Sequence, residues 1–113
     1  MPCLEVTTNV RVQDKNKLMR ALSDYICTEL CKAETYMMVM VKDETSMLFG
    51  GNDEPVAHIS LRALNLKDEL IRKLAGALTE MMHTELGIES QRVYIAFMDV
   101  DPGMWAWDGR TFA

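Results

Sequence analysis

The sequence predicts an α/β (α+β) fold in which two β-α-β units form one four-stranded sheet with two helices on one face. Short β-branched and apolar runs alternate with two amphipathic helical stretches, in the order strand, helix, strand, written twice. The two halves also resemble each other in sequence. The repeated residues are Leu18, Arg20 and Leu22 with Leu70, Arg72 and Leu74, and Thr28-Glu29-Leu30 with Thr84-Glu85-Leu86.

The first unit begins with a strand over residues 3–8, where apolar and polar side chains nearly alternate. A helix follows, with Asp14 as its N-cap and an apolar stripe with a spacing of four residues: Leu18, Leu22, Ile26 and Leu30. Residues 36–41 form a continuous apolar run, which is typical of a strand covered on both faces.

The second unit follows turn-forming residues at positions 49–53 and begins with a strand over residues 56–64. Its helix spans about residues 67–86 and stops at Gly87, with one apolar residue per turn. A strand over residues 92–99 and a Pro102-Gly103 turn lead to an aromatic tail, residues 104–113. The helical stripe consists of Leu70, Leu74, Leu78, Met82 and Leu86.

Length and composition exclude several classes of protein. With 113 residues the chain has room for one domain, residues 1–113, with a single core. Its 49% hydrophobic and 26% charged residues are globular values, and no apolar run reaches the roughly 20 residues of a membrane-spanning helix, so we expect no membrane insertion. Seventeen acidic residues against twelve basic ones give a net charge of -5, which disfavours nucleic acid as a partner.

The three cysteines indicate reduced thiols in a chain with no secretory leader, so we expect a cytoplasmic address. Cys27 and Cys31 lie one helical turn apart and are interpreted as buried small hydrophobes rather than a metal site. Both predicted helices cover the same face of the sheet, and strands this apolar cannot leave the opposite face exposed to water. A closed symmetric oligomer of identical chains would cover it.

Seven short motifs, in their order and spacing, resemble the macrophage migration inhibitory factor and D-dopachrome tautomerase family. They are MPCLEVTTNV at the start, Lys32, Tyr36, FGG-x-x-EP at 49–55, SLRAL at 60–64, RVYI at 92–95, and W-x-G-x-TF at 107–112. The resemblance implies the tautomerase fold, assembled as a homotrimer. It also implies keto-enol tautomerisation of small aromatic α-keto acids such as phenylpyruvate, or of dopachrome.

By this resemblance, Pro2 is the catalytic general base once the initiator Met1 has been removed. An α-amino group ordinarily titrates near 8, and burial beside a second cation brings its pKa toward neutrality. A chain that keeps Met1 has an amide nitrogen at Pro2, which cannot accept a proton. No cofactor is implied, because a base and an oxyanion-stabilising cation suffice for tautomerisation.

The resemblance also implies the substrate-binding residues. The Lys32 ammonium faces the substrate carboxylate or keto oxygen, and the backbone N–H of Leu64 binds the carboxylate. The aromatic pocket is lined by Tyr36, Tyr94, Trp107 and Phe112, with Tyr94 contributed across the subunit boundary. Taken alone, each of these side chains also fits ordinary packing or a solvated surface.

The chain departs from the family pattern at two pocket positions. Ala96 replaces an asparagine that hydrogen-bonds a phenolic substrate, which puts a preference for para-hydroxylated substrates in doubt. Trp105 replaces a smaller aliphatic residue and is expected to narrow the mouth of the pocket.

Two other functions remain open at this level. The first is a cytokine-like signalling protein, secreted by a leaderless route, that binds a cell-surface receptor and keeps only a vestigial pocket. The second is a scaffolding trimer with no pocket chemistry.

Overall fold

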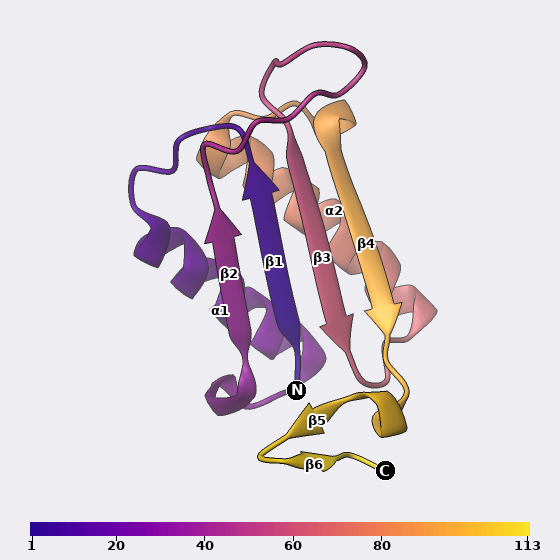
Figure 1. Cartoon of the computed structure of the whole chain (residues 1–113). Coiled ribbons are helices and arrows are strands. Elements are labelled where there is room, and N and C mark those ends of the chain that lie inside the picture. The colour runs from indigo at the N-terminus through magenta and orange to yellow at the C-terminus, as the bar shows by residue number, and fades with distance from the viewer.

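The computed structural model describes residues 1–113 as a four-stranded sheet that carries both long helices on one face (Figure 1). The sheet order is β2-β1-β3-β4, with β1 parallel to β2, β3 parallel to β4, and β1 antiparallel to β3. The predicted pair of β-α-β units is therefore present. The elements are β1 Cys3–Thr8, α1 Lys15–Leu30, β2 Met38–Lys42, β3 Ala57–Ala63, α2 Asp68–Leu86 and β4 Val93–Asp99.

Local capping residues set the ends of both helices. The Asp14 carboxylate accepts a hydrogen bond from the backbone N–H of Lys17 at 3.0 Å, so the predicted N-cap is confirmed. Gly87 ends α2 with a φ of 68°, in the left-handed region that favours glycine. Neither helix is long and apolar enough to cross a lipid bilayer.

The hydrophobic core lies between the sheet and the two helices. In β1 the side chains of Leu4 and Val6 point into it, and the intervening residues point to the opposite face, as strand alternation requires. The apolar stripes of both helices also reach the core, although Leu30, Leu70 and Leu86 at their ends are only partly buried. The fully buried members include Leu22, Ile26, Ile59, Leu61, Leu74, Leu78, Met82 and Ile88.

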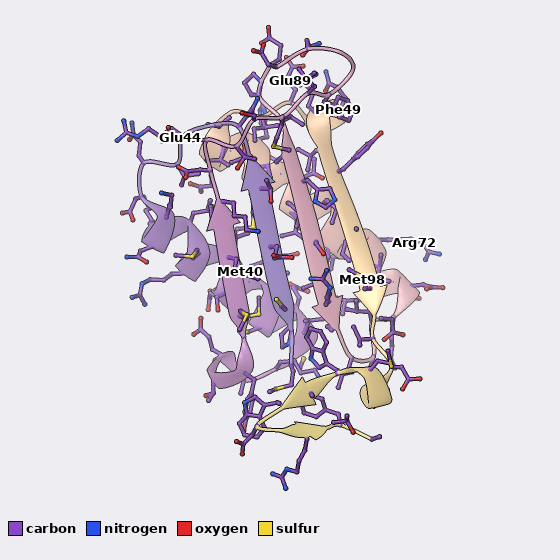
Figure 2. The ribbon with its side chains drawn as sticks, viewed as in Figure 1. Met40, Glu44, Phe49, Arg72, Glu89 and Met98 are labelled. Carbon is purple, nitrogen blue, oxygen red and sulfur yellow. The ribbon has the colours of Figure 1, made fainter.

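The other face of the sheet has no cover in the single chain. Met38 is 58% exposed, Tyr94 64% and Met98 39%, all three on strands of this face. Figure 2 shows Met40 of β2 and Met98 of β4 on the side turned away from the helices. A cross-strand ion pair between Arg62 and Glu5, 3.1 Å long, lies between the two apolar borders. The expectation that residues 36–41 are covered on both faces therefore does not hold within one chain.

Tyr36 was predicted to open the second strand, and this is wrong. A 3-10 turn over Glu34–Tyr36 precedes β2, which starts at Met38. The N–H of Met37 donates to the carbonyl of Glu34 at 3.0 Å, closing that turn. The turn carries the chain from the end of α1 to the start of β2, and it leaves Tyr36 at the end of the sheet.

Cys31 is exposed, contrary to the prediction of a buried thiol, whereas Cys27 is buried as expected. The physical reason is the end of α1: Cys31 is its C-cap, with φ 54° and ψ 43°. This left-handed residue turns the chain out of the helix, so the four-residue spacing no longer holds both thiols on one face.

The aromatic tail is ordered as a short hairpin, β5 Ala106–Trp107 with β6 Arg110–Thr111. Asp108 and Gly109 form its two-residue turn, both with positive φ (51° and 77°). An Asp-Gly pair is a strong hairpin signal, so this element was recognisable from the sequence. The preceding Pro102–Met104 segment is a 3-10 turn, as is Ser90–Arg92 before β4.

Candidate active site

An apolar pocket lies where the N-terminus meets the C-terminal hairpin. Figure 1 shows β5 and β6 across the end of the sheet, next to the start of β1. The pocket has a volume of about 240 Å³. Larger depressions near residues 10–18 and 49–55 have a greater share of polar lining residues. The apolar pocket is lined by Met1, Pro2, Cys3, Tyr36, Met38, Trp105, Ala106 and Trp107.

Pro2 is buried at the wall of this pocket, with less than 2% of its surface exposed. Its carbonyl accepts a hydrogen bond from the N–H of Met38 at 3.1 Å, which extends the β1–β2 pairing by one step. The residue that would carry the catalytic nitrogen is therefore held by the sheet itself and not by a loop.

The N-terminal amine lies in surroundings that favour its neutral form. Burial lowers the pKa of the Met1 amine from its ordinary value of 8.0, and the nearby positive charge of Lys32 lowers it further. Lys32 is placed by the end of α1, where its N–H donates to the carbonyl of Cys27 at 3.0 Å. The structure thus brings the N-terminus within range of the Lys32 charge, although the two are 31 positions apart in the chain, and Lys32 is not among the residues that line the pocket.

Two predicted aromatic residues meet at the mouth of the pocket. The rings of Tyr36 and Trp107 pack edge to face, with centroids 5.4 Å apart. Phe112 is partly buried in the adjoining hairpin. Its N–H donates to the carbonyls of Pro102 and Trp105, at 3.0 and 3.1 Å, which ties the end of the hairpin to its start.

Of the remaining predicted site residues, Leu64 lies at the end of the sheet that carries the pocket, whereas Tyr94 does not. Leu64 directly follows β3 at the end of the sheet where β1 begins, because Cys3 pairs with Arg62. Tyr94 pairs with His58, which lies four residues before Arg62 in β3, about 13 Å away at the rise of a strand. One chain therefore does not bring Tyr94 to the pocket that contains Pro2.

Tyr94 instead contacts the loop that carries the FGG motif. Its ring packs edge to face on Phe49 with centroids 5.0 Å apart, and the Arg92 guanidinium lies 5.1 Å from the Phe49 centroid. Arg92 also donates hydrogen bonds to four carbonyls of this loop. The distances are 2.8 Å to Pro55, 3.0 Å to Glu54, 3.1 Å to Phe49 and 3.4 Å to Asn52.

The sequence placed Arg92 in the RVYI motif but did not predict that its guanidinium clamps the 49–55 loop through hydrogen bonds to the loop carbonyls. The sequence signal was weak, because nothing local links an arginine before a strand to carbonyls some 40 residues earlier. Met38 is a second lining residue that was not predicted. The alternation of a strand that begins at Tyr36 would have placed both side chains on one face.

The indole of Trp105 makes a direct contact with the N-terminus. Its Nε1–H donates to the carbonyl oxygen of Met1 at 2.9 Å. The sequence indicated only that this side chain narrows the pocket. Its hydrogen bond depends on contact between residues 104 positions apart, for which the sequence contains no local signal.

Burial raises the pKa of the Cys3 thiol, and the nearby Glu5 carboxylate raises it further. Cys3 therefore contributes a neutral wall to the pocket. No group of three or more His, Cys, Asp or Glu side chains is positioned to hold a metal ion.

Comparisons with known proteins agree with this architecture. The family model described as macrophage migration inhibitory factor (MIF) matches residues 1–113. A homologue of that factor from Brugia malayi is 27% identical over 114 residues, covering 99% of each chain. The factor from Xenopus tropicalis is 28% identical over 115 residues, covering all of both chains.

Solved structures of such homologues have the same fold. The homologue from Prochlorococcus marinus superimposes with a TM-score of 0.93 at 29% identity, covering 98% of this chain and 99% of the other. The protein from Trichinella spiralis gives a TM-score of 0.90 at 25% identity, covering 97% and 99%. The four-stranded sheet with two helices is thus the tautomerase fold, and the chain belongs to the macrophage migration inhibitory factor family.

Proposed function

We propose that the chain, after removal of Met1, is a cofactor-independent keto-enol tautomerase acting on phenylpyruvate-like aromatic α-keto acids. Membership of the family supports a tautomerase or cytokine-like function in general. The observation that carries the more specific proposal is the environment of the N-terminal amine. Burial and the charge of Lys32 both lower the pKa of the Met1 amine, and the Pro2 nitrogen lies one residue further along the wall of the same apolar pocket, so these surroundings suit a general base working near neutral pH.

In this proposal Pro2 is the general base. Removal of Met1 turns the Pro2 nitrogen from an amide into a secondary amine at the wall of the pocket. The amine takes a proton from the carbon next to the keto group, and its ammonium form returns a proton to the enolate oxygen. Run in reverse, the same steps convert the enol to the ketone.

The neighbouring residues bind the substrate. Lys32 supplies the positive charge for the carboxylate, together with the backbone N–H of Leu64. The T-shaped pair of Tyr36 and Trp107 offers an apolar surface for the aromatic ring. A pocket of about 240 Å³ suits a single-ring acid, since pockets for drug-sized ligands measure about 300–1,000 Å³. The removal of Met1, which lines the pocket, adds to this space.

We also propose that the working form is a homotrimer. The open face of the sheet exposes the large apolar side chains of Met38, Tyr94 and Met98, which a second copy of the chain would remove from water. A neighbouring copy that covers it would carry its own Tyr94 toward the pocket, whereas Tyr94 of the same chain is too far from Pro2. Family membership supports an oligomer in general.

The test combines an intact mass, which reports whether Met1 is present, with a phenylpyruvate tautomerisation assay. Processed wild-type protein is expected to be active. Pro2→Gly keeps a free N-terminal amine in place but changes its basicity and position, and is expected to lose about 10²- to 10⁴-fold in kcat/KM.

A matched control inserts one alanine between Met1 and Pro2, so that processing leaves Pro2 as an amide; this protein is expected to be inactive. Activity that survives both changes would eliminate Pro2 as the base. Receptor binding that persists in both variants, from an inactive wild type, would instead favour the signalling function.

A further inference from the structure

The indole N–H of Trp105 marks a position next to the reaction centre. It donates to the carbonyl oxygen of Met1 at 2.9 Å, and that carbonyl belongs to the peptide bond whose nitrogen is the Pro2 nitrogen. In a planar peptide the oxygen and nitrogen are roughly 2.2 Å apart, given C=O and C–N bonds of about 1.23 and 1.33 Å. The indole nitrogen therefore lies within roughly 5 Å of the Pro2 nitrogen.

Removal of Met1 takes away the acceptor but leaves the donor in place. The Trp105 backbone is held by the hydrogen bond from the N–H of Phe112, 3.1 Å long, which does not involve Met1. The side chain lines the pocket and is only partly exposed. An indole can only donate, so removal of Met1 takes away the one protein acceptor of this N–H and leaves it open to water or to a substrate oxygen beside the free amine.

We propose that this N–H of Trp105 binds the keto oxygen of the substrate and stabilises the enolate that forms there. The inference rests on the proposed function, in which Pro2 removes the proton. The carbon that loses this proton must come within about 3–3.5 Å of the Pro2 nitrogen. The keto oxygen is bonded to the adjacent carbon, so it is the substrate oxygen nearest to that nitrogen.

The carbonyl oxygen of Met1 stands in for this keto oxygen in the unprocessed chain. Both are sp² oxygens close to the Pro2 nitrogen, and both can accept at 2.7–3.1 Å, the range in which donors stabilise an oxyanion. The carboxylate lies one bond further from the reacting carbon. The carboxylate binds Lys32 instead, because an ammonium is a better partner for a full negative charge than a neutral indole N–H.

The proposed step is balanced without any further reactant. The C–H electron pair becomes the new C=C bond, and its proton goes to the Pro2 nitrogen. The π electrons of the C=O bond move to oxygen, where the indole N–H meets the growing charge. The Pro2 ammonium then gives its proton to that oxygen to complete the enol.

The first test is Trp105→Phe in the processed protein, which removes the N–H but keeps a flat aromatic ring. Because the hydrogen bond strengthens as charge develops, kcat is expected to fall about 10- to 100-fold, and KM is expected to rise by no more than about tenfold, the ground-state share of the same contact. A raised KM at unchanged kcat would place the indole on the carboxylate or in packing and would overturn the proposal. Unchanged kinetics would overturn it as well.

The second test needs no turnover and uses two probes that differ only at the second carbon, 3-phenyllactate and 3-phenylpropanoate. The hydroxyl oxygen of phenyllactate occupies the place of the keto oxygen. Wild-type protein is expected to bind phenyllactate about tenfold more tightly, the contribution of about one hydrogen bond, and Trp105→Phe is expected to bind both acids equally. A preference that remains in the variant would refute the contact.

Thermal unfolding separates this function from a purely structural one. In a chain that retains Met1, Trp105→Phe breaks a hydrogen bond and is expected to lower Tm. In the processed chain the Met1 acceptor is gone, so the same change is expected to lower Tm less, by the lost packing of the larger ring alone. An equal loss in both forms would mean that the N–H is as well bound by protein without Met1 as with it, and would overturn the proposal.

The outcomes distinguish this inference from the proposed function. An inactive processed wild type would refute the tautomerase proposal, and the pair of acids would still decide whether Trp105 recognises an oxygen at the second carbon. An active wild type whose Trp105→Phe variant behaves identically would leave the tautomerase intact and remove Trp105 from it.

Discussion

Substitution of Arg92 by alanine tests whether one guanidinium holds the loop that carries the FGG motif. Four loop carbonyls accept hydrogen bonds from it, and its plane lies near the ring of Phe49, against which Tyr94 packs. The loop is exposed, so water replaces part of what is lost. For hydrogen bonds from a charged group on an exposed loop, Arg92→Ala is expected to lower the free energy of unfolding by about 1–3 kcal/mol.

This free energy converts to a melting shift through the size of the protein. At about 2.1 cal/mol/K per residue, 113 residues give an unfolding entropy of about 240 cal/mol/K. Each kcal/mol then lowers Tm by about 4 °C, so Arg92→Ala is expected to lower Tm by about 4–12 °C. Arg92→Lys retains the charge but has no planar fork of donors, and is expected to recover only a minor part.

The assay is calorimetry together with hydrogen exchange of the loop amides. Arg72→Ala is the matched control, because Arg72 projects from α2 away from the sheet (Figure 2) and is expected to change stability by less than about 0.5 kcal/mol. In Arg92→Ala the amides of Phe49 and Asn52, which pair with each other's carbonyls, are expected to exchange faster. Equal Tm values for the two alanine variants would refute the clamp.

Three further predictions concern charge and the open face. The charge of Lys32 lowers the pKa of the Met1 amine, and the proposed function has it act in the same way on the Pro2 amine after processing. Lys32→Ala is therefore expected to move the rising limb of kcat/KM to higher pH, and an unmoved limb would contradict this. The hydrogen bond from the N–H of Val12 lowers the pKa of Asp43, and Lys15 at 3.1 Å lowers it further. The ionised carboxylate therefore stabilises the fold above its ordinary pKa of 3.8, and this stabilisation is lost as the pH falls through the lowered pKa. The loss of Tm caused by Asp43→Asn is accordingly expected to shrink in acid. Met98→Asp would bury a carboxylate in the proposed homotrimer and is expected to give monomers in analytical ultracentrifugation, whereas an unchanged trimer mass would place Met98 outside the interface.

The elements that were predicted well are those whose signals are local. Asp14 caps the helix that begins at Lys15, and Gly87 ends α2, because each needs only its own backbone conformation and near neighbours. The strand over Cys3–Thr8 was predicted with its observed bounds, since alternation is a property of the strand alone.

The errors occur where the chain changes direction. Tyr36 belongs to a 3-10 turn and not to β2, and Cys31 faces solvent because the helix ends on it in a left-handed conformation. Periodicity cannot show such breaks, because the next residues continue the same apolar or four-residue pattern. The hairpin at Asp108-Gly109 is different: its signal was present in the sequence and was not used.

The sequence by itself determined the two β-α-β units, the family resemblance and the identity of the residues proposed for the site, because each depends on patterns along the chain. Only the tertiary structure decided which of them meet. It places Lys32 near the N-terminal amine, points the indole N–H of Trp105 at the Met1 carbonyl, and leaves Tyr94 beyond reach of Pro2 in one chain. These are contacts between residues far apart in sequence, set by strand register and by the path of the C-terminal hairpin, and no local pattern encodes their distances.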